Sequence, residues 1–309
     1  MATQRICFAQ VSDVHLMPET GCRCWWMSDS PRRQLEAAVA HLNQVPDLRF
    51  VVFTGDLVDQ ADPESFHSFQ EILAQLRVPY YLSLGNHDID TLGRKGRFNR
   101  DQFIRWCQSQ FPLSPAPTGY VDYSLSPLPG IRLIALDASL GRFPLPQGVL
   151  RPSQLHWLDE HLQTVPEEWL ILLIHQPPFI APTQMDAVLF RKYRLLSEPA
   201  SALHALLARH GRVVAVLSGH LHVPKVYVRD GIPYLTAPPL VGPVSALRVF
   251  ELDVNPRRGV LRYHWVKLPE LDPSPLWHGL VMGIRRDRWG QIPLRAKGSR
   301  SLPLPAAAW

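Results

Sequence analysis

Residues 213–222 read VVAVLSGHLH, an apolar run that ends in a glycine and two histidines. Short runs rich in β-branched residues predict buried strands, and Gly219 marks where this strand would end. Four other segments repeat the pattern: Ile6–Ser12 before Asp13, Arg49–Thr54 before Gly55-Asp56, Pro79–Leu84 before Gly85-Asn86-His87-Asp88, and Trp169–Ile174 before His175. Because open α/β sheets bind ligands at the carboxyl ends of their strands, we expect the five polar groups to meet in one cleft.

The segments between these runs predict the rest of an α/β fold. Amphipathic patterns predict helices over Arg32–Val45, Pro63–Leu76, Ser153–Leu162 and Ser201–His210. A second set of strand-like runs covers Val121–Leu125, Ile131–Leu136, Pro233–Ala237, Val244–Val254 and Val260–Val266. Two sheets stacked face to face, with helices outside, would accommodate all of these elements.

The composition is that of a folded enzyme-sized protein. Of the 309 residues, 46% are hydrophobic and 19% are charged, which excludes a disordered chain. The net charge of +5 does not by itself select nucleotide, nucleic acid or membrane as a partner. No stretch approaches the roughly 18 apolar residues of a spanning helix. The first apolar run has no cleavage pattern, so we interpret it as a strand and expect a cytoplasmic protein.

The chain divides by composition into residues 1–268, the predicted catalytic domain, and residues 269–309, a Pro/Arg-rich C-terminal extension. The extension loses hydrophobic periodicity, so we expect it to pack loosely. Four cysteines are too few for a disulfide framework in a chain of this length. Cys22-x-Cys24 lacks the two-residue gap of redox or zinc pairs, and we interpret both as loop thiols.

The strand-end residues together offer carboxylate, imidazole and amide donors, and no thiolate. Such donors suit divalent Mn, Fe or Zn, and the same donors accept each of these metals. The set exceeds the needs of one ion, whereas two ions about 3.5–4 Å apart that share a carboxylate would use it fully. Asp56, in the middle of the series, is the natural bridge. The predicted ligands are Asp13, His15, Asp56, Asn86, His175, His220 and His222.

The series D-x-H, G-D, G-N-H-D, H and G-H-x-H resembles the signature of the calcineurin-like metallophosphoesterases, with no position missing between residues 13 and 222. It is most similar to the bacterial class III cyclic-nucleotide phosphodiesterases of the cAMP phosphodiesterase CpdA type. The resemblance implies a four-layer α-β-β-α sandwich with two mixed sheets and flanking helices. It also implies hydrolysis by a metal-bridging hydroxide, without a phosphoenzyme.

The resemblance also implies individual roles. Asp13, His15 and His222 would bind one ion, Asn86, His175 and His220 the other, and Asp56 would bridge them. His87 would contact the phosphate and protonate the leaving oxygen, and Asp88 would orient His87; these two form the predicted catalytic pair.

Three functions remain open at this level. The first is a phosphodiesterase for a small diester, with 3′,5′-cyclic AMP the best single guess. The second is the same enzyme acting on another phosphate ester, such as a glycerophosphodiester or a phosphomonoester. The third is a binding module that kept the fold, which is disfavoured because such relatives lose ligands. The expected partner is a small phosphate ester, best a nucleotide, and we expect no stable nucleic-acid complex and no membrane span.

Two further sets of residues near the motifs have weaker signals. Trp25 and Trp26 follow Asp13 and could stack a nucleobase, although packing is the favoured interpretation. Arg94, Lys95 and Arg97 follow the G-N-H-D turn, where phosphate contact and a solvated loop are equally supported.

Overall fold

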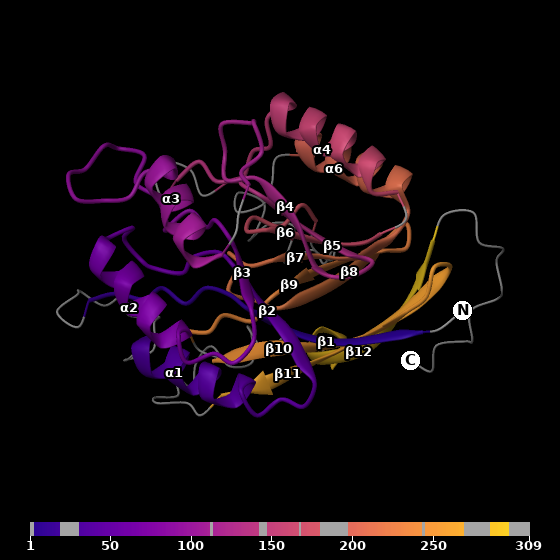
Figure 1. Ribbon diagram of the computed structural model, residues 1–309, viewed down its shortest axis with the longest axis horizontal. Helices are drawn as coiled ribbons and strands as arrows, with labels where there is room; N and C mark the ends of the chain where they lie inside the picture. Colours follow the sequence, from indigo (N-terminus) through magenta and orange to yellow (C-terminus); the bar gives the residue numbers. More distant parts are fainter. Residues whose placement is uncertain are drawn as a thin grey trace.

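Two six-stranded sheets lie face to face at the centre of the molecule, with helices over their outer faces (Figure 1). The structure is a computed structural model that describes residues 3–18, 31–111, 114–141, 147–166, 168–179, 197–242, 245–268 and 285–296. The expected α/β sandwich with two mixed sheets is confirmed.

Both sheets combine parallel and antiparallel pairs. The first has the order β12 (Trp289–Arg295), β11 (Arg258–Lys267), β10 (Ala246–Val254), β1 (Gln4–Val11), β2 (Leu48–Thr54) and β3 (Tyr80–Ser83). The second has the order β4 (Tyr123–Leu128), β5 (Ile131–Leu136), β6 (Trp169–Ile174), β7 (Val213–Ser218), β9 (Ile232–Thr236) and β8 (Lys225–Arg229). The runs β1-β2-β3 and β5-β6-β7-β9 are parallel, so their carboxyl ends share an edge of each sheet.

Alternation along the strands separates the space between the sheets from the outer layers. In β1, Phe8 points inward and stacks between Phe50 and Phe250, with ring centroids 5.2 and 4.6 Å away, whereas Ala9 and Val11 point outward. Because the central strands β6 and β7 are buried on both faces, their sequences are nearly continuous apolar runs rather than strict alternations.

Helices cover both outer faces. On the first sheet lie α1 (Pro31–Leu42), α2 (Pro63–Leu73) and α3 (Arg100–Gln110), and on the second lie α4 (Pro152–Thr164) and α6 (Ser197–His210). Asp62 caps α2 as the sequence favours, since its Oδ1 accepts a hydrogen bond from the Ser65 nitrogen at 2.8 Å. None of the helices in the described ranges combines the length and apolar character that a membrane crossing requires.

The expected loose packing of the C-terminal extension is wrong for residues 285–296. The short helix α8 (Arg285–Arg288) leads into β12, which pairs along its length with β11 and buries Ile292 and Leu294 against the inner core. The alternation of apolar and polar residues over 289–295 could have revealed this strand. The edge strand β8 and helix α3 were also not predicted. The division at residue 268 stays a prediction.

Candidate metal centre

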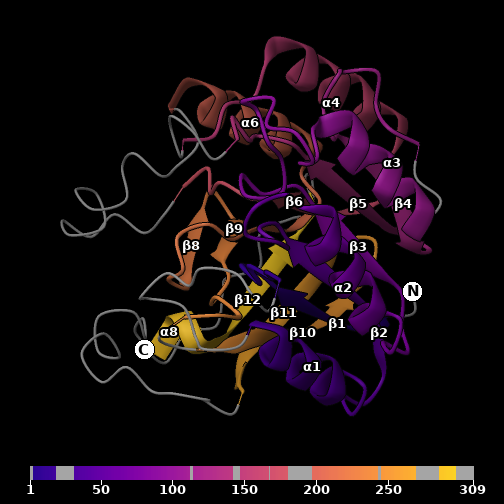
Figure 2. The same ribbon diagram turned by 90° about the vertical axis from the view of Figure 1, so that its left-hand side faces the viewer.

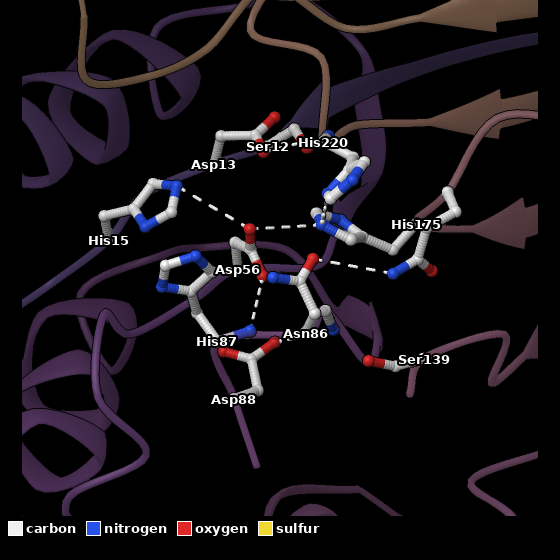
Figure 3. A network of polar contacts seen from close by, with 12 residues as sticks. Ser12, Asp13, His15, Asp56, Asn86, His87, Asp88, Ser139, His175 and His220 are labelled. Atoms are coloured by element: carbon white, nitrogen blue, oxygen red, sulfur yellow. Dashed lines mark hydrogen bonds and ion pairs between the residues drawn. The ribbon is translucent and has the colours of Figure 1, made fainter. Parts of the chain in front are cut away.

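Five parallel strands deliver polar side chains to one place, where the carboxyl edges of the two sheets meet (Figure 3). Backbone hydrogen bonds join the strand ends directly. The Asp13 nitrogen donates to the Gly55 carbonyl at 3.2 Å, and the Gly219 nitrogen donates to the His175 carbonyl at 3.0 Å. The expected convergence of these loops is therefore observed.

The backbone at these strand ends is strained. Eight non-glycine residues in the described part of the chain have positive φ angles, and five of them are predicted ligands: Asp13, His15, Asp56, His220 and His222, with φ between 46 and 71°. Left-handed backbone costs energy for residues that carry a Cβ, and it persists where the surrounding structure enforces it. Its concentration here marks a site that stability alone does not explain.

Two glycines permit the close approach of the loops. A Cβ at Gly85 would overlap the backbone nitrogen of Asp56, and a Cβ at Gly219 would overlap the Ser12 hydroxyl. Any side chain at either position would push the ligand loops apart. The glycines before Asn86 and His220 thus have a steric cause, as does Gly55 before Asp56, where a Cβ would overlap the His175 ring.

Asp13, His15 and His222 form a first donor group, whose ligand atoms all lie within 4.8 Å of one another. The Nε2 atoms of His15 and His222 face each other at 3.0 Å. Asp13 Oδ1 lies 3.4 Å from His222 Nε2 and accepts a hydrogen bond from the His220 nitrogen at 2.9 Å.

Asp56, His175 and His220 form a second donor group with the same spread of ligand atoms. His175 Nε2 is 3.1 Å from Asp56 Oδ2 and 3.2 Å from His220 Nδ1. The other ring nitrogen of His175 donates to the Thr54 carbonyl at 2.7 Å, which leaves Nε2 as the ring atom that faces the group.

Asp56 links the two groups. Its Oδ2 is 3.7 Å from His15 Nε2 in the first group and 3.1 Å from His175 Nε2 in the second, as the dashed lines in Figure 3 show. Its Oδ1 accepts a hydrogen bond from the His87 nitrogen at 2.9 Å, which fixes the carboxylate between the groups.

Asn86 lies beside Asp56 and His175 in Figure 3 and is 3% exposed. Its Oδ1 is 3.5 Å from Gln176 Nε2. The structure therefore brings all seven predicted ligands into one cluster.

The electrostatics of the cluster favour a cation. Burial would raise the pKa of Asp13, but the charge of His222 outweighs it and brings the pKa to about 2. Asp56 behaves alike, because His175 and His87 hold its pKa well below its usual range. Burial and the charge of His175 lower the pKa of His220 to about 3. The carboxylates are thus ionised and at least one imidazole is neutral, the states in which both bind metal.

The residues present fit two divalent ions. The buried Asp13 Oδ2 has no hydrogen-bond partner among the described residues, although an unpaired carboxylate oxygen in the interior is costly. The two ionised carboxylates, Asp13 and Asp56, also favour a positive charge between them. Nitrogen and oxygen donors without thiolate suit Mn, Fe or Zn.

The prediction that Asp88 orients His87 is not supported by the contacts. Asp88 is a fully buried carboxylate that accepts hydrogen bonds from the backbone nitrogens of Leu57, Val58 and Gly85, at 2.7, 3.1 and 2.8 Å. Burial and the charge of Asp56 raise its pKa to about 7. Asp88 therefore joins the two turns that carry Asp56 and Asn86.

Asp59, which sequence reasoning passed over, contacts His87 instead. His87 Nδ1 lies 2.9 Å from the Asp59 carbonyl and 3.1 Å from its carboxylate Oδ1, which is also 3.4 Å from His15 Nδ1. Burial would raise the pKa of Asp59, but the hydrogen bonds from His15 and His87 outweigh it and lower the pKa. A second carboxylate so soon after Gly55-Asp56 was the available signal.

The residues with weaker signals in the sequence fall into two sets. Arg94 pairs with Asp90 of its own loop, and Arg97 pairs at 3.3 Å with Asp62, the residue that caps α2. Cys22, Cys24, Trp25 and Trp26 lie outside the described residues.

Comparisons with known proteins agree with this site. The sequence profile of the calcineurin-like phosphoesterases matches residues 7–224, and the chain belongs to that family. It is accordingly a metal-dependent phosphoesterase, a hydrolase, as the resemblance in its motifs implied.

The relatives indicate which kinds of phosphoesterase this chain is similar to. A probable cyclic nucleotide phosphodiesterase of Rhodopseudomonas palustris is 29% identical, over 74% of this chain and 75% of the relative. A probable glycerophosphodiester phosphodiesterase of Arcobacter nitrofigilis is 30% identical, over 74% and 76%. The crystal structure of a dimetal phosphatase from Danio rerio, 18% identical, superposes with a TM-score of 0.65 over 86% of this chain and 99% of that one, which supports the fold.

Proposed function

We propose that this protein is a dinuclear phosphodiesterase for a small diester, with 3′,5′-cyclic AMP the preferred candidate. The observation that carries the proposal is the position of Asp56 Oδ2 between two compact donor groups. The similarity to a cyclic nucleotide phosphodiesterase supports the substrate class. A cytoplasmic location, expected from the sequence, suits a nucleotide substrate.

We assign Asp13, His15 and His222 to one ion and Asn86, His175 and His220 to the other. Asp56 serves both. The grouping of ligand atoms supports this division. When bound, the two divalent ions would supply an activated water and neutralise phosphoryl oxygens.

His87 is the candidate acid. Its side chain is 19% exposed, whereas those of Asp56 and Asp59 are nearly buried, so His87 can reach a bound substrate. Burial would lower its pKa, but the charge of Asp56 and the hydrogen bond with Asp59 raise it, which favours the protonated ring that an acid needs. With Nδ1 held by Asp59, Nε2 is the atom that would donate its proton to the leaving oxygen.

The test is turnover by purified, Mn-loaded protein. We expect hydrolysis of cyclic AMP and of bis-p-nitrophenyl phosphate. Asn86→Ala should lose metal, whereas His87→Ala should retain metal and lose about 10²-fold in kcat. The absence of turnover of both diesters would refute the proposal.

A glycerophosphodiester is the second candidate, because a relative of similar identity is named for that activity. The two are distinguished by kcat/KM for cyclic AMP and for glycerophosphoethanolamine under the same metal loading. A higher kcat/KM for the latter would replace cyclic AMP as the substrate and leave the metal site as assigned.

A further inference from the structure

The C-terminal segment 285–296 joins the two sheets beside β8, the edge strand of the second sheet (Figure 2). Its strand β12 belongs to the first sheet through β11, while its helix α8 contacts β8. The Tyr263 hydroxyl donates to the Arg286 carbonyl at 2.8 Å, and a Cβ at Gly290 would overlap that hydroxyl. The segment is thus fitted closely to β11.

Asp287 makes the contact with the second sheet. Its Oδ1 accepts a hydrogen bond from the backbone nitrogen of Val226 at 2.8 Å, and both residues are 3% exposed. An N–H on the outer side of an edge strand has no neighbouring strand to pair with, and leaving it buried without an acceptor is costly. Val226 follows the ligand His222 through Val223, Pro224 and Lys225 alone. The carboxylate therefore holds the end of the ligand loop.

Arg248 on β10 provides a second connection. Its side chain is fully buried, and its Nη2 donates to the Asp287 carbonyl at 3.1 Å. Within the described chain its Nε and Nη1 have no hydrogen-bond partner, so the guanidinium is held by the Asp287 carbonyl and by the Tyr263 ring, whose centroid lies 5.6 Å from Cζ. Burial lowers the pKa of Arg248 to about 10, and Tyr263 and Asp287 oppose that shift.

The buried Arg248 guanidinium lies next to Gln10, a residue that supports two of the ligand loops. Arg248 is the cross-strand partner of Gln10. The Gln10 amide donates to Thr54 Oγ1 and to the Ser218 carbonyl, both at 3.0 Å. Thr54 and Ser218 immediately precede the Gly-Asp and Gly-His turns, so Gln10 ties two ligand-bearing strand ends together.

We propose that Asp287 is a positioning residue for the metal centre, which holds the loop carrying His220 and His222 through its contacts with Val226 and Arg248. The inference rests on the proposed dinuclear function of that site. Because the loop supplies a ligand to each assigned ion, its release weakens both. Residues 285–296 then form part of the catalytic unit although they lie beyond the family match at residues 7–224.

The experiment compares Asp287→Ala with Asp287→Asn, in which Oδ1 can still accept from Val226. Arg285→Ala is the matched control, because this exposed neighbour on the same helix has its guanidinium 4.4 Å from the centroid of the Trp289 ring. Mn²⁺ affinity is measured by chelator competition, and amide hydrogen exchange over residues 219–228 is measured on metal-free protein.

We expect Asp287→Ala to weaken Mn²⁺ binding by about tenfold and to speed exchange over residues 219–228, with kcat recovering at saturating Mn²⁺. Asp287→Asn should restore most of the affinity, and Arg285→Ala should match the wild type. If the alanine variant does not fold, Asp287→Ser, whose shorter side chain cannot reach Val226, takes its place.

Wild-type Mn²⁺ affinity and exchange in Asp287→Ala would overturn the inference, even if that variant melted at a lower temperature. So would an asparagine variant as weak as the alanine variant. A wild-type protein that binds no Mn²⁺ would instead refute the proposed function. Exchange over residues 219–228 would still report whether Asp287 holds the loop.

Discussion

Two predicted ligands of the site differ in their access to solvent. The side chain of His175, in the second group, is 0% exposed, and its ring is fixed by the Thr54 carbonyl. The side chain of His222, in the first group, is 23% exposed and lies on the loop that Asp287 contacts at Val226. His175 is therefore built into the core between the sheets, whereas His222 lies on a loop at the surface, which also carries His220 of the second group.

This difference shows that the depth at which a ligand is buried and the number of ligands that an ion has are separate properties of a metal site. A buried donor set is preorganised, so an ion that binds there orders few side chains and dissociates slowly. A donor on an accessible loop can exchange its ion with solvent more readily. Both donor groups depend on Asp56, because its carboxylate contributes to each of them.

Asp56→Ala should have the largest effect. Its removal deprives both groups of their shared carboxylate, so we expect both ions to be lost and kcat to fall by more than about 10³-fold. Metal content after dialysis and turnover of bis-p-nitrophenyl phosphate measure this. Asp159→Ala, at an exposed pair with Arg209, is the control. Retention of two ions by Asp56→Ala would contradict the bridging assignment.

His175→Ala and His222→Ala should differ in their effect on the free energy of unfolding of metal-free protein. We expect the first to lower the free energy of unfolding by about 2–4 kcal/mol, since it leaves a cavity in the core and removes a buried hydrogen bond to the Thr54 carbonyl. The second should cost less than about 1 kcal/mol, as is usual for partly exposed positions. Urea unfolding in excess chelator measures both. Equal losses would show that the difference in burial has no energetic consequence.

Asp59→Asn should have a moderate effect on the rate. The carboxylate fixes the ring of His87, so we expect kcat to fall by about tenfold with KM nearly unchanged. Asp88→Asn should act chiefly on stability, because Asp88 accepts backbone hydrogen bonds. Steady-state kinetics and thermal unfolding of both variants distinguish the roles. A fall in kcat in Asp88→Asn alone would restore the original assignment.

Arg94→Ala should have the smallest effect. Its side chain is 48% exposed and already paired with Asp90. We expect kcat/KM to change by less than about twofold, as is typical of exposed ion pairs. A larger loss in kcat/KM would show that Arg94 leaves Asp90 to meet the substrate.

Local patterns predicted most of the fold. The apolar runs that end in Gly-Asp, Gly-Asn and Gly-His mark strands β2, β3 and β7, since a strand buried on both faces must be apolar throughout. Together with the runs that end before Asp13 and His175, they predicted the seven ligand candidates from the sequence. Strand β8 was missed, because a short edge strand carries a weak pattern of its own and is defined by its partner. Strand β12 was missed although its alternation over residues 289–295 was an available signal.

The sequence by itself determined which chemical groups stand at the strand ends, because residue type and strand periodicity are local properties. Only the tertiary structure decided which of those groups touch. The exchange of roles between Asp59 and Asp88, and the contact of Asp287 with Val226, join residues far apart in the chain or on different turns. Such contacts arise from sheet order and packing, which no local pattern encodes.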